Sequence, residues 1–253
     1  MDTPITILVA NDGARIACRR RTGNLPGVMF CGGFRSDMTG TKAAALDAWA
    51  EVAGRLFVRF DYRGHGESSG EFTDGTIGLW RDDALLVLDR ASNGPVVLAG
   101  SSMGAWIALL VALARPERVH GLVLVAPAID FTETLIRDRL PDDARATLER
   151  DGVWLRPSEY SDEPDRITHR LIEEGRQHLL LGGPIPFRGP VRILHGLADE
   201  TVPWEYGLRT AGALASEDVT VTLVKDGDHR LSDPKDLARL TSALDEVIVT
   251  AAP

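Results

Sequence analysis

The chain has 253 residues, of which 44% are hydrophobic and 26% are charged, and its formal net charge is −9. This length supports one large domain whose core needs no disulfides or metal ions, so we expect a single domain over residues 1–253. The composition excludes a disordered or fibrous chain, and the negative charge argues against a nucleic-acid partner, because phosphate binding depends on clustered cations.

The first residues, MDTPITILVANDG, lack both the basic region and the long apolar region of a secretory signal peptide. The longest apolar run, Ala105–Ala114, is about half as long as a segment that spans a bilayer. Cys18 and Cys31 have no CxxC spacing and lie in strand-like runs, where buried free thiols are common. We therefore expect a cytoplasmic protein without a membrane span.

Short apolar, β-branched runs alternate with segments of helical periodicity along most of the chain. The predicted strands are residues 5–10, 28–33, 56–62, 96–101, 122–128, 191–196 and 221–227. The predicted helices are residues 41–53, 77–91, 103–114 and 234–249. This alternation predicts an α/β fold with a mostly parallel sheet covered by helices on both faces. The first two runs, separated by Asn11-Asp12-Gly13, are expected to form an antiparallel hairpin, because Asp-Gly suits a tight turn.

The alternation breaks between about residues 128 and 190. This stretch holds charged helical segments, the run GVWLRPSEYSDEP and a glycine- and proline-rich cluster, GGPIPFRGP. It contains too few apolar residues to form a core of its own. We expect an inserted helical cap, approximately residues 129–188, that lies over the sheet.

The stretch VVLAGSSMGAWIALL contains a G-x-S-x-G pattern where a predicted strand turns into a predicted helix. A serine on such a strained turn brings the residues two before and two after it close together, so only small residues fit there. Of the two adjacent serines, only Ser102 has glycines at both positions, Gly100 and Gly104. Ser102 is therefore the candidate nucleophile, and Ser101 is a neighbour.

A serine nucleophile needs a histidine base, which in turn needs an orienting carboxylate. In this type of fold the chain order is Ser, acid, His, with the acid and the histidine each following a late strand. Asp199 in RILHGLADETVP and His229 in TLVKDGDHRLSDP stand at those positions. Asp226 and Asp228 remain alternatives for the acid, although residues so close to His229 in sequence rarely meet it side chain to side chain.

The other histidines are expected to have turn or packing roles; they are His65, His120, His169, His178 and His195. His195 and Asp199 have i, i+4 spacing, but at the end of a strand this spacing does not put them on one helical face. The chain also lacks an H-E-x-x-H motif. We expect no metal site and no cofactor.

An acyl-transfer site needs two N–H groups that stabilise the oxyanion of the tetrahedral intermediate. One comes from the residue after the nucleophile, here Met103, and the other from the loop after an early strand. In the loop GGFRS the natural donor is the amide of Phe34. A further glycine-rich turn, Asp61–Gly70, lacks the G-x-G-x-x-G pattern of a nucleotide site, and we expect a structural role for it.

The segments GGF, DYRGHGESSG, GSSMG, HGLADETVP and GDH, taken in this order, resemble the α/β-hydrolase superfamily over essentially the whole chain. This resemblance implies a mostly parallel eight-stranded sheet with helices on both faces and an inserted helical cap. The stretches GGFRSDMTGTKA, GVWLRPSEYS and LHGLADETVPW resemble more narrowly the family of α/β-hydrolase domain-containing protein ten, whose members are acyl-protein thioesterases and acyl-glucuronide esterases. Arg35 departs from that family, in which an uncharged residue is expected after GF.

From the motifs and the resemblance together we predict a serine hydrolase that cleaves carboxylic acyl esters or acyl thioesters of small molecules or acyl-proteins. The candidates for the acyl pocket are cap residues, namely Phe131, Leu135, Trp154 and Tyr160. Two alternatives remain: a serine peptidase or carbon–carbon bond hydrolase on the same scaffold, and a non-catalytic protein that binds a small ligand. The sequence carries no signal for an oligomeric state.

Overall fold

The computed structural model describes residues 3–157 and 163–250. The strands in these ranges are β1 (Ile5–Val9), β2 (Arg15–Arg21), β3 (Asn24–Cys31), β4 (Arg55–Phe60), β5 (Val96–Ser101), β6 (Val119–Val125), β7 (Val153–Arg156), β8 (Asp165–Thr168), β9 (Val191–Gly196) and β10 (Val219–Val224). The α-helices are α1 (Thr41–Ala53), α2 (Ile77–Ala91), α3 (Met103–Ala114), α4 (Asp142–Asp151), α5 (His169–Gly175), α6 (Glu205–Ala213) and α7 (Pro234–Thr250). Short 3-10 or π turns are η1 (Phe72–Asp74), η2 (Thr132–Ile136), η3 (Arg137–Arg139) and η4 (Arg176–His178).

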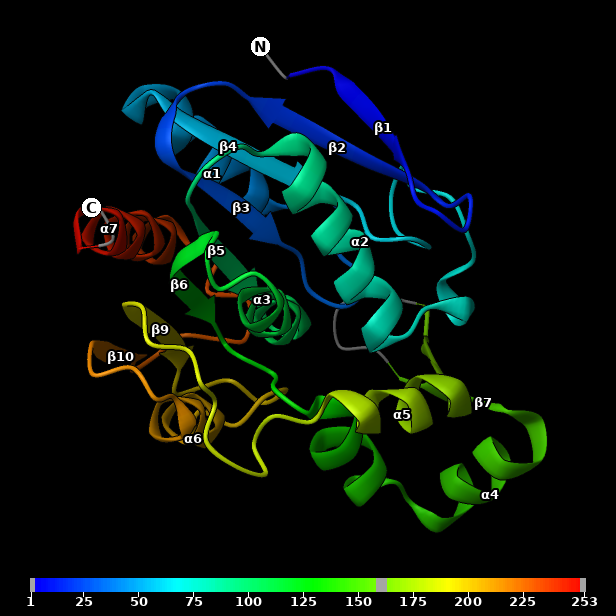
Figure 1. Cartoon of the computed structure of the whole chain (residues 1–253). Helices are drawn as coiled ribbons and strands as arrows, with labels where there is room; N and C mark the ends of the chain where they lie inside the picture. The colour runs from blue at the N-terminus through cyan, green and yellow to red at the C-terminus, as the bar shows by residue number, and fades with distance from the viewer. Residues whose placement is uncertain (1–2, 158–162, 251–253) are drawn as a thin grey trace.

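Eight of these strands form one twisted sheet in the order β1-β2-β4-β3-β5-β6-β9-β10 (Figure 1). β2 pairs antiparallel with β1 and with β4, and every other pair in the sheet is parallel. The predicted mostly parallel, eight-stranded α/β architecture is therefore confirmed. β7 and β8 form a separate antiparallel ribbon away from the sheet.

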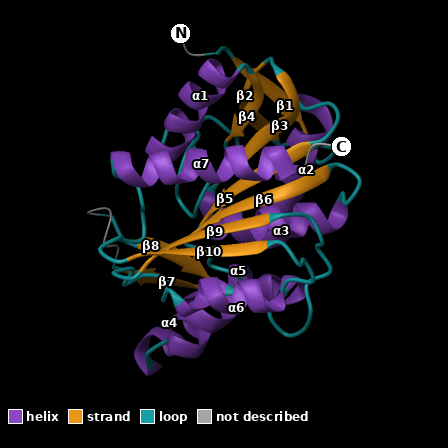
Figure 2. Ribbon diagram, turned by 90° about the vertical axis from the view of Figure 1, so that its left-hand side faces the viewer, coloured by secondary structure: helices purple, strands orange, loops and turns teal. Residues whose placement is uncertain are grey.

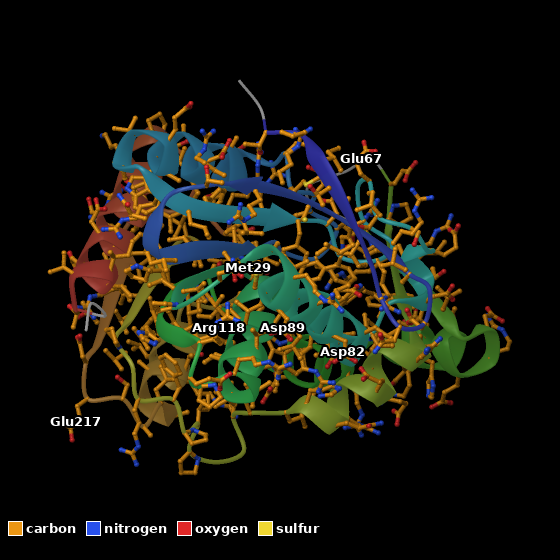
Figure 3. The ribbon with its side chains drawn as sticks, turned by 45° about the horizontal axis from the view of Figure 1, so that its top comes forward. Met29, Glu67, Asp82, Asp89, Arg118 and Glu217 are labelled. Carbon is orange, nitrogen blue, oxygen red and sulfur yellow. The ribbon has the colours of Figure 1, made fainter. Side chains whose placement is uncertain are left out.

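Helices cover both faces of the sheet, because its central strands are apolar on both sides. Val28 packs with α1 and α7, whereas the next residue, Met29, packs with α2 and α3 on the opposite face. Figure 2 shows α7 crossing one side of the strands, with α3 behind them. Met29 lies in the middle of the molecule in Figure 3, and the exposed Glu217 lies at its periphery. In residues 3–157 and 163–250, every helix is too short or too polar to cross a bilayer.

The predicted hairpin exists, but its predicted partner strand is wrong. Residues 5–9 pair with residues 15–21 through the turn that contains Gly13, whose φ is 87°. The run at 28–33 instead becomes β3, which lies parallel between β4 and β5. The tight turn joins the strands immediately beside it, whereas a strand such as β3 that is apolar on both faces belongs in the centre of the sheet.

The polar stretch that interrupts the alternation connects β6 to β9, which are adjacent parallel strands. We call residues 126–190 the β6–β9 segment; it holds η2, η3, α4, the β7–β8 ribbon, α5 and η4. In Figure 1 it lies beyond one end of the sheet. Its buried side chains, such as Ile167 and Leu171, join the apolar cluster that includes Trp106 of α3, so the segment packs on the helices of one face.

Candidate active site

Ser102 lies on the sharp turn between β5 and α3. Its φ of 54° and ψ of −119° fall outside the regions that non-glycine residues usually adopt, which is the strain expected of a nucleophile elbow. Its amide donates to the carbonyl of Val125 at 2.9 Å, and its own carbonyl accepts from the amides of Ala105 and Ala128 at 3.0 and 3.2 Å. The turn is thus held by backbone hydrogen bonds to β6 and to the loop that follows it.

The two glycines of the motif lie where backbone segments meet. A Cβ on Gly100 would lie 2.5 Å from the carbonyl oxygen of Gly104 and 2.7 Å from Cα of Ala105. A Cβ on Gly104 would lie closer than 3.0 Å to the carbonyl oxygens of Cys31 and Gly32. The predicted reason for small residues at both positions is confirmed, and the turn is also pressed against the end of β3.

The three residues selected from the sequence meet in one hydrogen-bonded chain. Nε2 of His229 lies 3.1 Å from Oγ of Ser102, and Nδ1 of His229 lies 2.8 Å from Oδ2 of Asp199. These distances are within the range for proton transfer and for orientation of an imidazole. Ser102 follows β5, Asp199 follows β9 and His229 follows β10, so the carboxyl ends of parallel strands bring them together.

Asp199 is buried and accepts hydrogen bonds at both oxygens. Oδ1 accepts from the amides of Thr201 and Val202, and Oδ2 also lies 3.2 Å from Nε2 of the fully buried His195. Burial by itself would raise the pKa of Asp199, but the hydrogen bonds from His195 and His229 outweigh burial and lower this pKa to about 2. Asp199 therefore stays ionised and keeps a proton on Nδ1 of His229.

His195 contacts Asp199, although a packing role is expected for it from the sequence. The i, i+4 spacing does not predict this pair, because the two residues do not share a helix. The backbone reverses after β9, and Nε2 of His195 reaches both Asp199 and the carbonyl of Val202, the latter at 2.9 Å. His195 is thus a second support for the acid rather than a packing residue alone.

The alternative acids do not take the position of Asp199. Asp226 is exposed, and Oδ1 of Asp228 accepts from the amide of Leu231 at 2.8 Å. Leu231 has a φ of 42°, so Asp228 stabilises the strained turn that follows His229. Of the histidines, only His229 lines the cavity at Ser102; His120, His169 and His178 lie elsewhere, and His178 pairs with Glu174 at 2.7 Å.

The amides selected for the oxyanion flank Ser102 on two sides. Met103 is the first residue of α3, so its N–H has no acceptor within the helix. On the other side, a Cβ on Gly33 would lie 3.3 Å from the carbonyl oxygen of Ser101 and 3.5 Å from Cβ of Ser102. The loop that carries Phe34 is therefore packed directly against the elbow, and both residues line the same cavity as Ser102.

An aromatic cluster packs against the loop that carries Phe34. The ring of Phe34 makes edge contacts with Phe72, Trp80 and Phe131, with centroids 4.9, 6.0 and 5.8 Å away. His65, in the glycine-rich turn after β4, packs against the same Phe72 and Trp80. Burial lowers the pKa of His65 to about 4, so this side chain is neutral near pH 7.

A cavity of about 650 Å³ opens over Ser102. Its lining includes the apolar side chains of Phe34, Phe131 and Leu135. It also includes ionisable groups, namely Arg35, Asp37, Lys42, Arg156, Asp165, Glu200 and Arg230. Of the predicted acyl-pocket residues, Phe131 and Leu135 reach this cavity, Trp154 lines a different hollow, and Tyr160 lies outside the described residues.

The chain is similar to known proteins over almost its whole length. The model of a family described as serine aminopeptidase, S33, matches residues 27–170. Palmitoyl-protein thioesterase ABHD10, mitochondrial, from Bos taurus is 40% identical over 247 residues, which are 97% of this chain and 80% of that protein. The human protein of the same name is 38% identical over the same shares. The solved structure of alpha/beta hydrolase domain-containing protein 10 from mouse matches with a TM-score of 0.92 at 38% identity, covering 99% of this chain and all of that one.

These relatives contradict the expected cytoplasmic location. The bovine and human proteins are both named as mitochondrial. The expectation depended on the composition of the first residues, which does not decide between the cytosol and an organelle. The prediction of a cytoplasmic protein is therefore wrong.

Proposed function

This chain belongs to the serine aminopeptidase S33 family of α/β-hydrolases, and we propose that it cleaves acyl thioesters and carboxylic acyl esters with Ser102 as the nucleophile. It is a hydrolase with the α/β-hydrolase fold, and the name of its ABHD10 relatives, palmitoyl-protein thioesterase, supports an acyl substrate. The observation that carries the mechanism is the continuous chain of hydrogen bonds from Ser102 through His229 to Asp199.

In the first half of the reaction, Oγ of Ser102 attacks the acyl carbonyl carbon while Nε2 of His229 takes the hydroxyl proton. The amides of Met103 and Phe34 stabilise the oxyanion of the tetrahedral intermediate. When that intermediate collapses, the bond to sulfur or oxygen breaks, and His229 gives its proton to the leaving thiol or alcohol. In the second half, water attacks the acyl-enzyme, His229 takes a proton from it, and Ser102 recovers its proton as the acid departs.

The cavity suggests how a substrate is oriented. The acyl chain packs against Phe131 and Leu135, and polar lining residues such as Glu200 and Arg230 face the leaving group. The β6–β9 segment contributes both apolar residues, so we assign the role of the predicted cap, residues 129–188, to this segment. The substrate class is an acylated small molecule or acyl-protein.

The test compares wild type with Ser102→Ala on p-nitrophenyl esters and matched acyl thioesters, from acetyl to palmitoyl. We expect Ser102→Ala to lower kcat by ~10⁴-fold or more without a change in fold, as triad knockouts do. Ser101→Ala is the matched control, because it removes the neighbouring hydroxyl and should retain activity within a few-fold. An active Ser102→Ala enzyme would overturn the mechanism.

The description of the matching family favours one second candidate, an aminopeptidase. Such an enzyme must bind the α-amino group of a peptide, and Asp37, Asp165 and Glu200 are acidic groups on the cavity wall. Rates of hydrolysis of aminoacyl p-nitroanilides, measured beside the esters and thioesters, distinguish the aminopeptidase from the acyl hydrolase. Faster cleavage of these amides than of any ester or thioester would replace the acyl-hydrolase proposal with the peptidase.

A further inference from the structure

Arg35, the residue after the Phe34 oxyanion donor, has an unusual backbone conformation. Its φ is 59°, in the left-handed region that few non-glycine residues occupy. Its amide donates to Nε2 of His65 at 3.3 Å, which fixes one side of the Phe34–Arg35 loop to the aromatic cluster beneath it. Nδ1 of His65 lies 3.2 Å from the carbonyl of Arg63, so the neutral tautomer with its proton on Nδ1 satisfies both contacts.

The side chain of Arg35 lines the cavity and bonds to the β6–β9 segment. Its Nη1 lies 3.3 and 3.1 Å from the carbonyl oxygens of Glu163 and Pro164 and 3.1 Å from Oδ1 of Asp165. The other oxygen of Asp165 accepts from Nη2 of Arg156 at 2.7 Å. Arg156 and Asp165 are paired residues of the β7–β8 ribbon, so one carboxylate joins this ribbon to the oxyanion loop.

We propose that Arg35 is a positioning residue that holds the Phe34 amide in place by tying the oxyanion loop to the β7–β8 ribbon. This inference rests on the proposed function, because it concerns the oxyanion site of the same reaction. A left-handed non-glycine residue is strained and persists only where its surroundings impose it. Here the two restraints are the bond from the amide to His65 and the bonds from Nη1 of the guanidinium to the β6–β9 segment.

The geometry of the site explains why such a restraint affects the reaction rate. An oxyanion donor must lie about 2.7–3.1 Å from the developing charge, and a shift of about 1 Å can cost ~10²-fold in rate. The N–H of Phe34 belongs to the Gly33–Phe34 peptide, and the loop touches the elbow at Gly33, so a shift of this loop acts on the reacting centre. Asp165 is buried with only 8% of its surface exposed, whereas the side chains of Arg35 and Arg156 are 30% and 32% exposed, so the carboxylate is held between two partly exposed guanidinium groups.

The experiment compares Arg35→Met, Arg35→Lys and Asp165→Asn with wild type. The readouts are kcat and KM for an acyl thioester, and the inhibition constant of a trifluoromethyl ketone that forms a tetrahedral adduct with Ser102. We expect Arg35→Met to lower kcat about 10- to 100-fold and to raise the inhibition constant of the ketone by a similar factor, with KM nearly unchanged. Arg35→Lys keeps the positive charge but not the planar guanidinium group, and should recover part of this loss.

The double variant Arg35→Met/Asp165→Asn should lose little more than the worse single variant, because both changes break the same link. Arg166→Met, an exposed residue on the same ribbon, is the matched control and should match wild type. Circular dichroism and the melting temperature report folding separately from activity.

A change in KM alone, or in melting temperature alone, would overturn the proposal, because it would make Arg35 a substrate contact or a structural ion pair. If wild type cleaves no ester or thioester, the proposed function fails, and the rate at which a fluorophosphonate labels Ser102 takes the place of kcat. Equal labelling rates for wild type and Arg35→Met would then refute the role of Arg35, and a slower rate for the variant would support it.

Discussion

The elbow around Ser102 and the β6–β9 segment above it are held in place by different forces. At the elbow, backbone segments approach so closely that Gly100 and Gly104 leave no room for a methyl group, and the flanking strand and helix are apolar. The β6–β9 segment packs on the helices of one face through apolar side chains such as Ile167 and Leu171, and charged side chains add hydrogen bonds to backbone amides. Within the segment, Asp130 accepts from the amides of Leu180 and Leu181, each at 2.8 Å, and Glu174 accepts from the amide of Gly78 in α2.

Because of this difference, we expect the elbow to tolerate few substitutions and the β6–β9 segment to tolerate more. Close packing of backbone tolerates almost no change, because the atoms that would clash cannot move aside. Side-chain contacts can adjust when one residue changes, so the β6–β9 segment can vary in sequence while its attachment persists. The catalytic centre thus lies on the constrained region, and the adaptable segment contributes part of the cavity lining, including Phe131 and Leu135.

The largest effect is expected from Asp199→Asn, which tests the chemistry of the constrained region. Asparagine keeps the shape but favours the wrong tautomer of His229, so kcat should fall by ~10⁴-fold. Ester or thioester turnover measures this loss. Asp226→Asn, the same change at an exposed position near His229, should leave kcat within a few-fold of wild type. A larger loss in Asp226→Asn than in Asp199→Asn would reassign the acid.

Gly104→Ala tests the close packing of the elbow. The added methyl group would collide with the carbonyls of Cys31 and Gly32, and we expect the free energy of unfolding to fall by about 3 kcal/mol or more. Gly182→Ala is the control in the β6–β9 segment, where a Cβ would meet no atom within 4 Å, and should change stability by less than about 0.5 kcal/mol. Urea denaturation measures both, and equal effects would remove the contrast between the regions.

The pH dependence of stability tests the aromatic cluster under the oxyanion loop. The pKa of His65 falls from 6.5 to about 4 on folding, chiefly through burial, so the unfolded chain binds more protons between these values. Stability should therefore decrease by about 3 kcal/mol as the pH falls from 6.5 to 4. His65→Phe should flatten this slope, whereas His169→Gln, at an exposed histidine, should not. An unchanged slope in His65→Phe would contradict the assignment.

The smallest effect is expected within the β6–β9 segment, where Asp130 joins its two ends. Asp130→Asn leaves one oxygen to serve two amides, so one partly buried N–H loses its acceptor, at a cost of about 2 kcal/mol. Hydrogen exchange should quicken at Leu180 and Leu181 and remain unchanged at α3. Asp138→Asn, at an exposed position, is the control. Faster exchange throughout the sheet would show that the Asp130 contacts stabilise the whole fold and not the β6–β9 segment alone.

Several features followed from the sequence because their causes are local or belong to the fold class. The alternation of apolar strands and helices predicted the parallel sheet, since strands buried on both faces need continuous apolar runs. The glycines around Ser102 identified the elbow, since the turn itself excludes larger residues. Asp199 and His229 could be selected because the carboxyl ends of parallel strands converge at one edge of the sheet.

Other features depended on which distant residues the tertiary structure brings together. Arg35 and Asp165 are 130 positions apart, and neither carries a periodic signal that indicates the other. His195 reaches Asp199 only because the backbone reverses after β9, and Trp154 of the β6–β9 segment lines a different hollow from the cavity at Ser102. Periodicity reports which side of an element is buried, but the partner of a charged side chain is decided by the path of the backbone between elements. The sequence by itself therefore determined the elbow and the sheet, and only the tertiary structure decided what supports the acid and what anchors the oxyanion loop.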